Sequence, residues 1–407
     1  MYSLVVRYTR ILYKEKMKFG ISVYPEQKTF EEIESYLKLA SKYDFKKVFT
    51  SMFTIGKNAQ EIIERSTILC NLAHRYGMEV SVDANPPLFD YLGAKPDDLS
   101  IFKEIGIDSI RMDMNFTDER DVQLVNNKEK IKIEFSAFMI AAVNKIIDNG
   151  ADSKNMQVCH NFYPQRYTGI DSKIAQSIND HWKTKGIPVG IFISSIETDA
   201  TGPWPVMDGL PSIEEHRDIP CDIQLRHLLA MNNVDEILFG NAFASEEEFK
   251  SISSIIDILN KKDGQLEDDD ANMLIKTLLP PRPIKKHLLT ICFEKNISDI
   301  EKKIALEFPL HIDLNDGTSY MLRSRLPRYK NEKVLYRNVD KKIFKRGDVV
   351  IVNNNCNRYQ GELQLVLKDM KVDWQRNLIG HINEIEIFLI DYIKPLEQFA
   401  FIEGKAK

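Results

Sequence analysis

Eight short apolar runs, separated by helical patterns, constrain what this chain can fold into more than any other feature. The runs lie near residues 18–24, 46–50, 78–83, 108–113, 130–134, 156–161, 188–194 and 236–241. Between most of them, apolar residues recur at the three- and four-residue spacing of an amphipathic helix. Regular alternation of strand and helix implies parallel strands. An open doubly wound α/β sheet is the rival architecture, but eight repeats favour a closed (β/α)8 TIM-type barrel.

Acidic residues stand at the ends of four of these runs, namely Glu26, Asp83, Asp113 and Glu134. The carboxyl ends of parallel barrel strands meet at one face, where (β/α)8 enzymes hold their catalytic groups. Side chains two apart in a strand share a face, so three pairs should point into the barrel: Ser81 with Asp83, Arg111 with Asp113, and Lys132 with Glu134. Buried charges are costly unless they are paired or lie at the wet mouth, so this pattern indicates a site.

Length and a change of pattern after the eighth run predict two domains. The chain has 407 residues, more than the roughly 250 of a typical barrel. We expect an N-terminal extension at 1–16, a catalytic barrel at 17–270, a linker at 271–283 and a small all-β barrel domain at 284–405. The extension should be dispensable for function, because the first strand begins just after Met17.

Composition and charge exclude several classes of protein. The net charge of −5 offers no general attraction to nucleic acid or to an acidic membrane surface. No run approaches about 18 uninterrupted apolar residues, so we expect no membrane span. The five cysteines lack C-x-x-C spacing, which fits a reducing compartment such as the cytoplasm. His216 has no second histidine at a metal-type spacing, and no metal site is expected in the barrel.

The loop after the sixth run carries groups that a phosphorylated sugar would need. It contains His160, Asn161, Tyr163, Arg166 and Thr168. Sugar hydroxyls need mixed donors and acceptors, and a phosphate favours Arg or His together with backbone amides. The alternative is an ordinary turn rich in Asn, Pro and Gly, with a histidine that is satisfied structurally.

Two further segments are candidates for substrate binding. Glu215, His216 and Arg217 end the long loop after the seventh run, and they suit either the polar end of a lid or a solvated first helical turn. In the β domain, Arg323 and Asn354 are groups that the domain could present to a site, although the segments around them also suit ordinary turns.

Two of the four strand-end carboxylates could act as acid and base, as glycoside cleavage requires. Asp113 and Glu134, on adjacent strands, form the leading pair, with Asp83 and Glu26 in reserve and the individual roles left open. The structural alternative for each carboxylate is an ion pair that holds loop geometry. The catalytic hypothesis requires the acidic side chains to converge on a common rim with an imidazole and a guanidinium.

Several longer motifs resemble the family of 6-phospho-N-acetylmuramidases. They are Gly20-Ile-Ser-Val-Tyr-Pro-Glu26, Ile110-Arg-Met-Asp113, Lys132-Ile-Glu134, His160-Asn-Phe-Tyr-Pro164, Glu215-His-Arg217, Tyr320-Met-Leu-Arg-Ser324 and Tyr359-Gln-Gly-Glu-Leu363. The resemblance covers nearly the whole chain from Met17 and implies a TIM-type barrel followed by a cyclophilin-like β-barrel. It also implies cytoplasmic hydrolysis of N-acetylmuramic acid 6-phosphate linked β-1,4 to N-acetylglucosamine, in peptidoglycan recycling and without a cofactor.

That substrate is consistent with the residues at the predicted mouth. Its phosphate and lactyl carboxylate would meet Arg111, His160 and either Arg166 or Arg323. Thr201, which stands where many family members have arginine, leaves the substrate details open. A phosphosugar isomerase or epimerase with one carboxylate as base is the alternative enzyme, and a phosphosugar-binding regulator is the alternative without turnover. Neither a nucleic-acid nor a membrane partner is expected, and a homo-oligomer is compatible with the sequence.

Overall fold

The computed structural model describes residues 17–53, 55–203, 208–260, 286–307, 311–315, 317–324 and 332–404. The chain divides after Ile258 into two compact units, which we call the barrel unit and the β unit. The expected N-terminal extension at 1–16 and the expected linker at 271–283 lie outside the described residues. The domain limits expected at 270 and 284 fall in the same undescribed stretches and stay predictions.

Eight parallel strands close into a barrel, which confirms the predicted fold class. In chain order they are β1 (Lys18–Ser22), β2 (Lys47–Ser51), β3 (Glu79–Ala84), β4 (Ser109–Met112), β5 (Lys132–Ser136), β6 (Met156–Cys159), β7 (Val189–Ile193) and β8 (Glu236–Phe239). Each strand pairs with the next, and β8 pairs with β1 to close the ring. Every predicted run overlaps one of these strands, and closure excludes the open doubly wound sheet.

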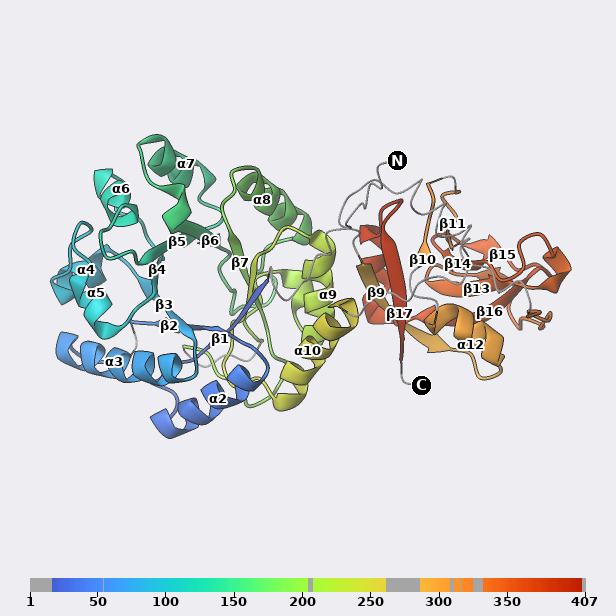
Figure 1. The fold of residues 1–407 in the computed structure, drawn as a ribbon, viewed down its shortest axis with the longest axis horizontal. Coiled ribbons are helices and arrows are strands. Elements are labelled where there is room, and N and C mark those ends of the chain that lie inside the picture. Colours follow the sequence, from blue (N-terminus) through green and yellow to red (C-terminus); the bar gives the residue numbers. More distant parts are fainter. Residues whose placement is uncertain are drawn as a thin grey trace, which may run out of the picture. The chain divides into compact units, whose positions relative to one another are not determined.

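Helices surround the barrel strands, as Figure 1 shows. Those of the barrel unit are α2 (Phe30–Lys42), α3 (Ala59–Arg75), α4 (Pro86–Leu92), α5 (Ser100–Ile105), α6 (Glu119–Val125), α7 (Ile140–Asp148), α8 (Ser172–Thr184), α9 (Cys221–Met231) and α10 (Glu246–Asn260). The start of α2 is fixed by a capping box, in which the Thr29 hydroxyl accepts the N–H of Glu32 and the Glu32 carboxylate accepts the N–H of Thr29. None of the helices in the described ranges has the length and apolar character needed to cross a membrane.

The pairing register sets the height of each polar side chain inside the barrel. Asp83 of β3 pairs with Arg111 of β4, and Arg111 pairs with Glu134 of β5. Asp113 follows two residues beyond Arg111, just past the end of β4. Arg111 and Glu134 are buried whereas Asp113 is exposed, so these groups lie at different depths. Lys132, which we expected to point inward, is exposed because it is the first residue of β5.

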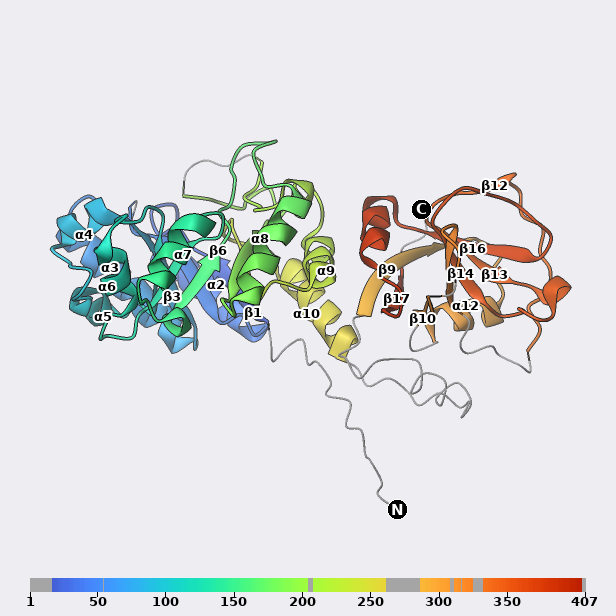
Figure 2. The ribbon, with the colours of Figure 1, turned by 90° about the horizontal axis from the view of Figure 1, so that it is seen from above.

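The loops that follow the strands gather at one end of the barrel. Figure 2 views the barrel unit from the side and shows the segment between β7 and α9 projecting from that end. This is the carboxyl end of the strands, because the segment follows β7 directly. Catalytic groups of (β/α)8 enzymes are held at this end.

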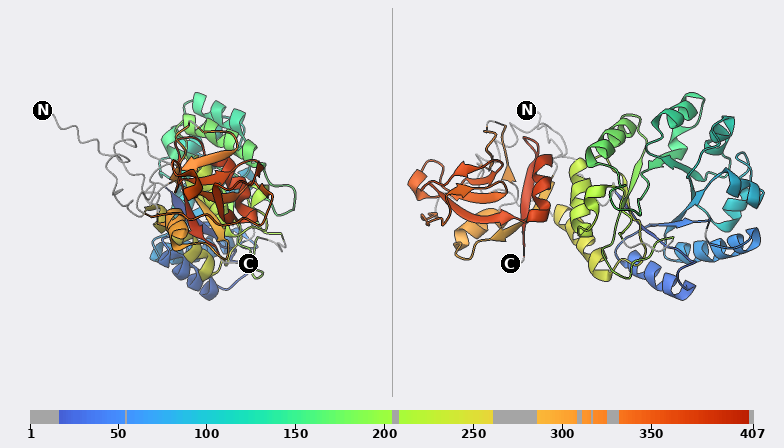
Figure 3. Two further views of the ribbon diagram at one scale, coloured as in Figure 1. Left: turned by 90° about the vertical axis from the view of Figure 1, so that its right-hand side faces the viewer. Right: turned by 180° about the vertical axis from the view of Figure 1, so that it is seen from behind.

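The β unit is built on a seven-stranded, nearly closed, barrel-like sheet. In sheet order its strands are β10 (His311–Ile312), β17 (Gln398–Glu403), β9 (Lys286–Phe293), β16 (Arg376–Ile382), β13 (Asp348–Val352), β14 (Leu363–Val366) and β11 (Met321–Ser324). The short pair β12 (Ile343–Phe344) and β15 (Met370–Lys371) accompanies the sheet, as does the helix α12 (Asp299–Leu306), which is light orange in Figure 3. The β-rich second domain predicted from the sequence is therefore confirmed.

Candidate active site

A cavity of about 220 Å³ lies at the carboxyl end of the barrel strands. It is lined by Tyr24, Phe49, Ser51, Phe53, Asp83, Arg111, Asp113, Asn161, Phe162 and Pro203. These residues come from strands or from the loops that directly follow them. The acidic side chain of Asp83 from β3, the guanidinium of Arg111 from β4 and the acidic side chain of Asp113 just after β4 thus share one cavity, whereas the expected imidazole does not line it.

Arg111 organises the polar wall of this cavity. Its Nη1 atom donates to Asp83 Oδ1 at 2.7 Å, and its Nη2 atom donates to Asn161 Oδ1 at 2.5 Å. Its Nε atom lies 3.2 Å from Glu134 Oε1, and its Cζ atom lies 5.9 Å from the centroid of the Phe49 ring. All three nitrogens face protein partners. Arg111 therefore holds its neighbours in place rather than offering an uncommitted cation to a phosphate.

The two carboxyl groups on the cavity wall have different surroundings. Burial raises the pKa of Asp83 to about 6 against the opposing charge of Arg111, and the charges of Asp113 and Glu134 raise it further. Asp113 is exposed, and its carboxylate has no hydrogen-bond or ion-pair partner among the residues that the structure describes. The pair thus combines a carboxyl group that titrates near neutral pH with an accessible one.

Glu134, one of the predicted leading pair, lies in the barrel interior and does not line the cavity. It is 2% exposed, its Oε2 atom accepts from Gln157 Nε2, and the same atom lies 3.5 Å from Lys47 Nζ. Lys47 in turn lies 2.5 Å from Glu236 Oε1. Buried charges persist when they are paired in this way. Glu134 is thus a buried, paired carboxyl group that does not line the cavity, and its catalytic role stays a prediction that the cavity lining does not support.

Asn161 reaches the cavity, but His160 does not. Asn161 Oδ1 accepts from Ser136 Oγ at 3.0 Å in addition to Arg111. His160 is 3% exposed, its Nε2 atom lies 2.7 Å from Asn179 Oδ1 in α8, and burial lowers its pKa. Successive residues of an extended segment point to opposite faces, so an inward Asn161 leaves His160 directed outward. These contacts favour a structural role for His160, and its predicted role in substrate binding is not supported by the cavity lining.

Hydrogen bonds of Arg217 and Glu214 join the loop that follows β6 to the loop that follows β7. Arg217 donates through Nη1 to Asp208 O at 2.7 Å, through Nη2 to Tyr163 O at 3.1 Å, and to the Glu214 carboxylate at 2.8 Å. Glu214 accepts the N–H of Gly169, and the hydrogen bond from Arg217 lowers its pKa to about 2. A Cβ atom at Gly169 would lie 2.6 Å from this carboxylate, so the close approach requires glycine. Arg217 therefore holds loop geometry, and its expected contact with substrate stays a prediction.

Two predicted residues of the β6 loop also serve the loop itself. Arg166 pairs with Asp208 at 3.1 Å and with Asp218 at 2.5 Å. Thr168 Oγ1 donates to Gln165 O at 2.6 Å, and Thr168 is exposed. Neither side chain lines the cavity. Their predicted contact with substrate is therefore not supported by the cavity geometry.

Glu215 and His216 are likewise outside the cavity lining. The Glu215 carboxylate accepts from the N–H and the hydroxyl of Ser172, the first residue of α8. His216 is fully buried, and its Nε2 atom lies 2.9 Å from His227 Nδ1. The Glu-His-Arg triplet therefore stabilises the β7 loop and neighbouring helices, which favours the structural alternative over a polar lid.

Tyr163 and Glu26 lie close to the cavity without lining it. Burial raises the pKa of the half-buried Tyr163 phenol, and the charge of Arg111 acts against that rise. Burial is also the main cause of the raised pKa of Tyr24, to which the charges of Asp83 and Glu26 contribute. Both predicted residues are thus within electrostatic reach of the cavity wall.

The reasoning from sequence missed the aromatic side of the cavity. Tyr24, Phe49, Phe53 and Phe162 line it, and the rings of Phe49 and Phe162 meet edge to face with their centroids 6.2 Å apart. A cavity with aromatic walls and a few convergent polar groups suits a sugar ring, whose apolar face can stack on an aromatic. The signal was present, because Tyr24, Phe49 and Phe162 stand in or directly after the apolar runs.

Arg323 and Asn354 lie in the β unit and have different surroundings there. Arg323, in β11, lines a cavity of about 290 Å³ within that unit. Asn354 is exposed, and its Oδ1 atom accepts the N–H of Tyr336 at 2.9 Å. Asn354 therefore holds local backbone structure, whereas Arg323 belongs to a cavity of the β unit itself.

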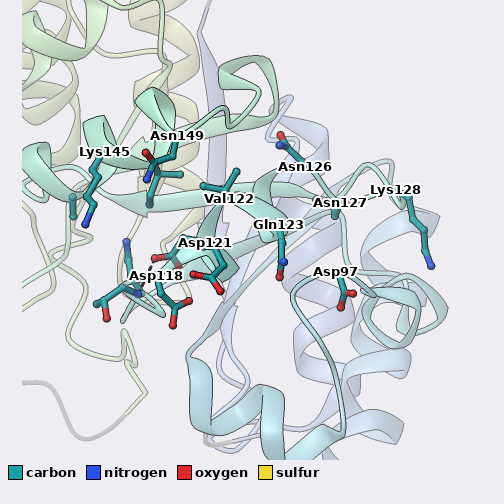
Figure 4. Close-up of a pocket in the computed structure, with 15 residues that line it drawn as sticks. Asp97, Asp118, Asp121, Val122, Gln123, Asn126, Asn127, Lys128, Lys145 and Asn149 are labelled. Carbon is teal, nitrogen blue, oxygen red and sulfur yellow. Dashed lines mark hydrogen bonds between the residues drawn. The ribbon is translucent and has the colours of Figure 1, made fainter.

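A larger hollow of about 1050 Å³ lies beside α6 and α7 (Figure 4). Two of its four carboxylates hold local structure: Asp121 accepts the N–H groups of Phe116 and Thr117, and Asp118 pairs with Arg120 at 2.8 Å. These engagements make it a weaker candidate for acid–base chemistry than the cavity at the strand ends. Across the described ranges, no three His, Cys, Asp or Glu side chains are grouped so that they could hold a metal ion.

Comparisons with solved structures support this architecture. The chain is similar to an uncharacterized protein from B. cereus, with 33% identity, a TM-score of 0.79, and coverage of 95% of this chain and 100% of that one. A conserved protein of unknown function from Enterococcus faecalis is 24% identical, with a TM-score of 0.64 and coverage of 95% and 96%. No protein in the curated set matches the chain.

Family models identify both parts of the chain. The N-terminal model of 6-phospho-N-acetylmuramidase matches residues 19–254, which span the eight barrel strands. The C-terminal model of the same family matches residues 287–402, which span most of the β unit. Together they cover most of the described residues, in agreement with the motifs that the sequence presents. The chain therefore belongs to the 6-phospho-N-acetylmuramidase family.

Proposed function

We propose that the protein is a glycoside hydrolase that cleaves the β-1,4 bond between N-acetylmuramic acid 6-phosphate and N-acetylglucosamine, in the cytoplasmic recycling of peptidoglycan. Membership of the family supports the substrate. The cavity supports the reaction class, because carboxyl groups from two neighbouring strands share it. The observation that carries the proposal is the contrast between Asp83, with its pKa raised to about 6, and the exposed Asp113.

In the proposed reaction, Asp83 is the general acid. Its burial keeps part of the population protonated near neutral pH, and the hydrogen bond from Arg111 Nη1 orients its carboxyl group. Asp83 donates its proton to the glycosidic oxygen as the bond to the anomeric carbon breaks, so that N-acetylglucosamine leaves as an alcohol. Asp113 supplies the second carboxylate: it takes a proton from the water whose oxygen forms the new bond to the anomeric carbon, so that the muramic acid phosphate leaves as a free sugar.

The shape of the cavity supports binding of one sugar ring. Its volume of about 220 Å³ is below the roughly 300–1,000 Å³ of pockets that enclose drug-sized ligands. Phe49, Phe53 and Phe162 offer apolar surface, and Asn161 adds an amide to the polar side. The muramic acid ring would occupy this cavity, with the N-acetylglucosamine ring directed toward solvent.

Incubation with the disaccharide tests the proposal directly. The purified protein should release N-acetylglucosamine from the 6-phosphorylated disaccharide and leave the unphosphorylated disaccharide intact, and pretreatment with a chelator should not change the rate. Released N-acetylglucosamine can be measured by chromatography. A folded protein that cleaves neither form would contradict the proposal; conversion of a sugar phosphate without cleavage would favour the isomerase, and binding without turnover would favour the regulator.

The pH dependence of kcat/KM tests the role of Asp83. An acid catalyst works only in its protonated form, so activity should fall as the pH rises through about 6, the raised pKa of Asp83. Initial rates between pH 4 and pH 9 would reveal this alkaline limb. Asp83→Asn should remove the limb together with most of the activity. A wild-type rate that stays constant from pH 5 to pH 8 would exclude Asp83 as the acid.

A further inference from the structure

We infer that the β unit carries a binding site for a sugar-sized molecule that bears a carboxylate or a phosphate. The site is the cavity of about 290 Å³ that Arg323 and Arg376 line together with Tyr359, Gln364 and Gln375. Such binding goes beyond the proposed hydrolysis and involves residues of the β unit alone. Two guanidinium groups line one small cavity, and this arrangement suggests an anionic ligand.

The first guanidinium is fixed by a fully buried carboxylate. Arg323 donates from Nε to Glu362 Oε1 at 2.7 Å and from Nη2 to Glu362 Oε2 at 3.1 Å. Glu362 is 0% exposed, whereas the Arg323 side chain keeps 21% of its surface accessible. Such a two-point pairing sets the plane of the guanidinium. The carboxylate lies behind the arginine, and the accessible part of the arginine contributes to the cavity wall.

A glutamine links this pair to the second guanidinium. Gln364 is 3% exposed, donates to Glu362 Oε1 at 2.9 Å, and accepts from Arg376 Nε at 2.7 Å. Arg376 Nη1 donates to Asp373, and its Nη2 atom has no partner among the described residues. The cavity wall therefore presents an oriented N–H donor from Arg376 beside the fixed guanidinium of Arg323.

The two arginines would recognise an anion by the geometry of their N–H donors more than by net charge. Glu362 and Asp373 each balance one arginine, so an anion would not be attracted strongly from a distance. At close range, oriented guanidinium donors suit the two or three oxygens of a carboxylate or phosphate. The Tyr359 ring, whose centroid lies 5.4 Å from Arg323 Cζ, adds an aromatic surface next to these donors. A sugar carrying an acidic group satisfies both features.

The pairing of two strands explains why the two polar segments meet. The segment Tyr320–Ser324 contributes β11 and the segment Tyr359–Leu363 leads into β14, and these strands pair antiparallel with Arg323 opposite Gln364. The motifs of the second domain that resemble the family thus converge on one cavity. The hydrolysis proposed for the barrel unit does not use either segment. Ligand binding in the β unit would give both segments a function.

Fluorine NMR of the full-length protein labelled with 5-fluorotryptophan tests the inference. Trp374 is exposed and immediately precedes Gln375 and Arg376, and its resonance among those of the three tryptophans can be assigned with Trp374→Phe. Titration with N-acetylmuramic acid, which carries a carboxylate, or with N-acetylglucosamine 6-phosphate should shift this resonance to saturation. Uncharged N-acetylglucosamine should not shift it. The titrant that shifts the resonance shows whether the site binds a carboxylate or a phosphate.

Matched variants distinguish binding in the cavity from nonspecific binding to the protein surface. Arg376→Gln should raise the half-saturating concentration about tenfold or more, because a charge-assisted hydrogen bond is lost. Arg376→Lys, which keeps the charge without the planar fork, should give a smaller increase. Arg346→Gln removes a partly exposed arginine that pairs with Asp391 and does not line the cavity, and it should leave the titration unchanged.

The inference is overturned if neither acidic sugar shifts the Trp374 resonance, if the uncharged sugar shifts it equally, or if Arg376→Gln titrates like the wild type. The thermal unfolding of each full-length variant, followed by circular dichroism, reports whether the β unit stays folded. Cleavage of the disaccharide is measured separately. A protein that cleaves without a Trp374 response contradicts only this inference, and a response without cleavage contradicts only the proposed function.

Discussion

Replacing Asp113 with asparagine should lower kcat for the phosphorylated disaccharide by about 10²–10⁴-fold while the protein remains folded. Asp113 lies on the wall of the strand-end cavity, next to Asp83 on the neighbouring strand. Its side chain is exposed and supports no other described residue, so the variant loses a reacting group and little structure. Steady-state rates and the thermal unfolding midpoint, measured on the same preparation, check both halves of this expectation.

Asp90→Asn is the matched control for that variant. Asp90 is an exposed aspartate in α4 of the same unit and does not line the cavity, so its replacement should leave kcat unchanged. Asp113→Asn with more than a tenth of the wild-type kcat would remove Asp113 from the reaction. Glu134→Gln with a loss as large as that of Asp113→Asn and an unchanged unfolding midpoint would return the catalytic role to Glu134.

Replacing Lys47 with methionine should lower the free energy of unfolding of the barrel unit by about 3–5 kcal/mol at pH 8. Although burial acts against it, the charges of Glu236 and Glu134 raise the pKa of Lys47, so its ammonium stays charged. Methionine has a similar length without the charge, and it would leave two carboxylates that are 6% and 2% exposed without their shared cation. Urea unfolding followed by tryptophan fluorescence, with the buried Trp182 as reporter, measures the change.

The pH dependence of that loss has a definite sign. Burial raises the pKa of Glu236 and Lys47 acts against that rise, so without Lys47 the Glu236 carboxyl group would bind its proton more tightly in the folded protein than in the unfolded chain, where carboxyl pKa values are about 4.3. Stability then falls as the pH rises above that value, so the loss should be smaller at pH 5 than at pH 8. The neighbouring Lys46 is about half exposed and lies 3.2 Å from Asp44, and Lys46→Met should cost no more than about 0.5 kcal/mol. Equal stability of the two variants at pH 8 would show that the buried cation is not needed.

The sequence predicted the barrel well because its signals are local. Each strand is a short apolar run, and helix starts such as Thr29 with Glu32 depend on residues three apart. The strand ends also pointed to Asp83, Arg111, Asp113 and Asn161, which line one cavity. These residues could be predicted because the end of an apolar run in the sequence marks the carboxyl end of a barrel strand, where catalytic groups are held.

What could not be predicted is the depth and direction of individual side chains, because both depend on neighbours far away in the chain. Glu134 stands level with Arg111 in the strand register, below Asp113, and a single sequence does not display the stagger between strands. His160 is a different case, since the alternation that makes Asn161 point inward directs His160 outward. For Arg217, the partners Asp208 and Tyr163 belong to other parts of two loops, and only the folded chain brings them together.

The line of charges from Asp83 through Arg111 and Glu134 to Lys47 and Glu236 has a consequence for engineering this barrel. Glu134 contributes to the proton affinity of Asp83 although it touches no cavity surface. A designer could therefore shift the working pH range by altering side chains deep in the scaffold, leaving the substrate-facing surface untouched. Conversely, transferring only the cavity-lining residues to another scaffold would transfer Asp83 without Glu134, whose charge helps to raise the pKa of Asp83.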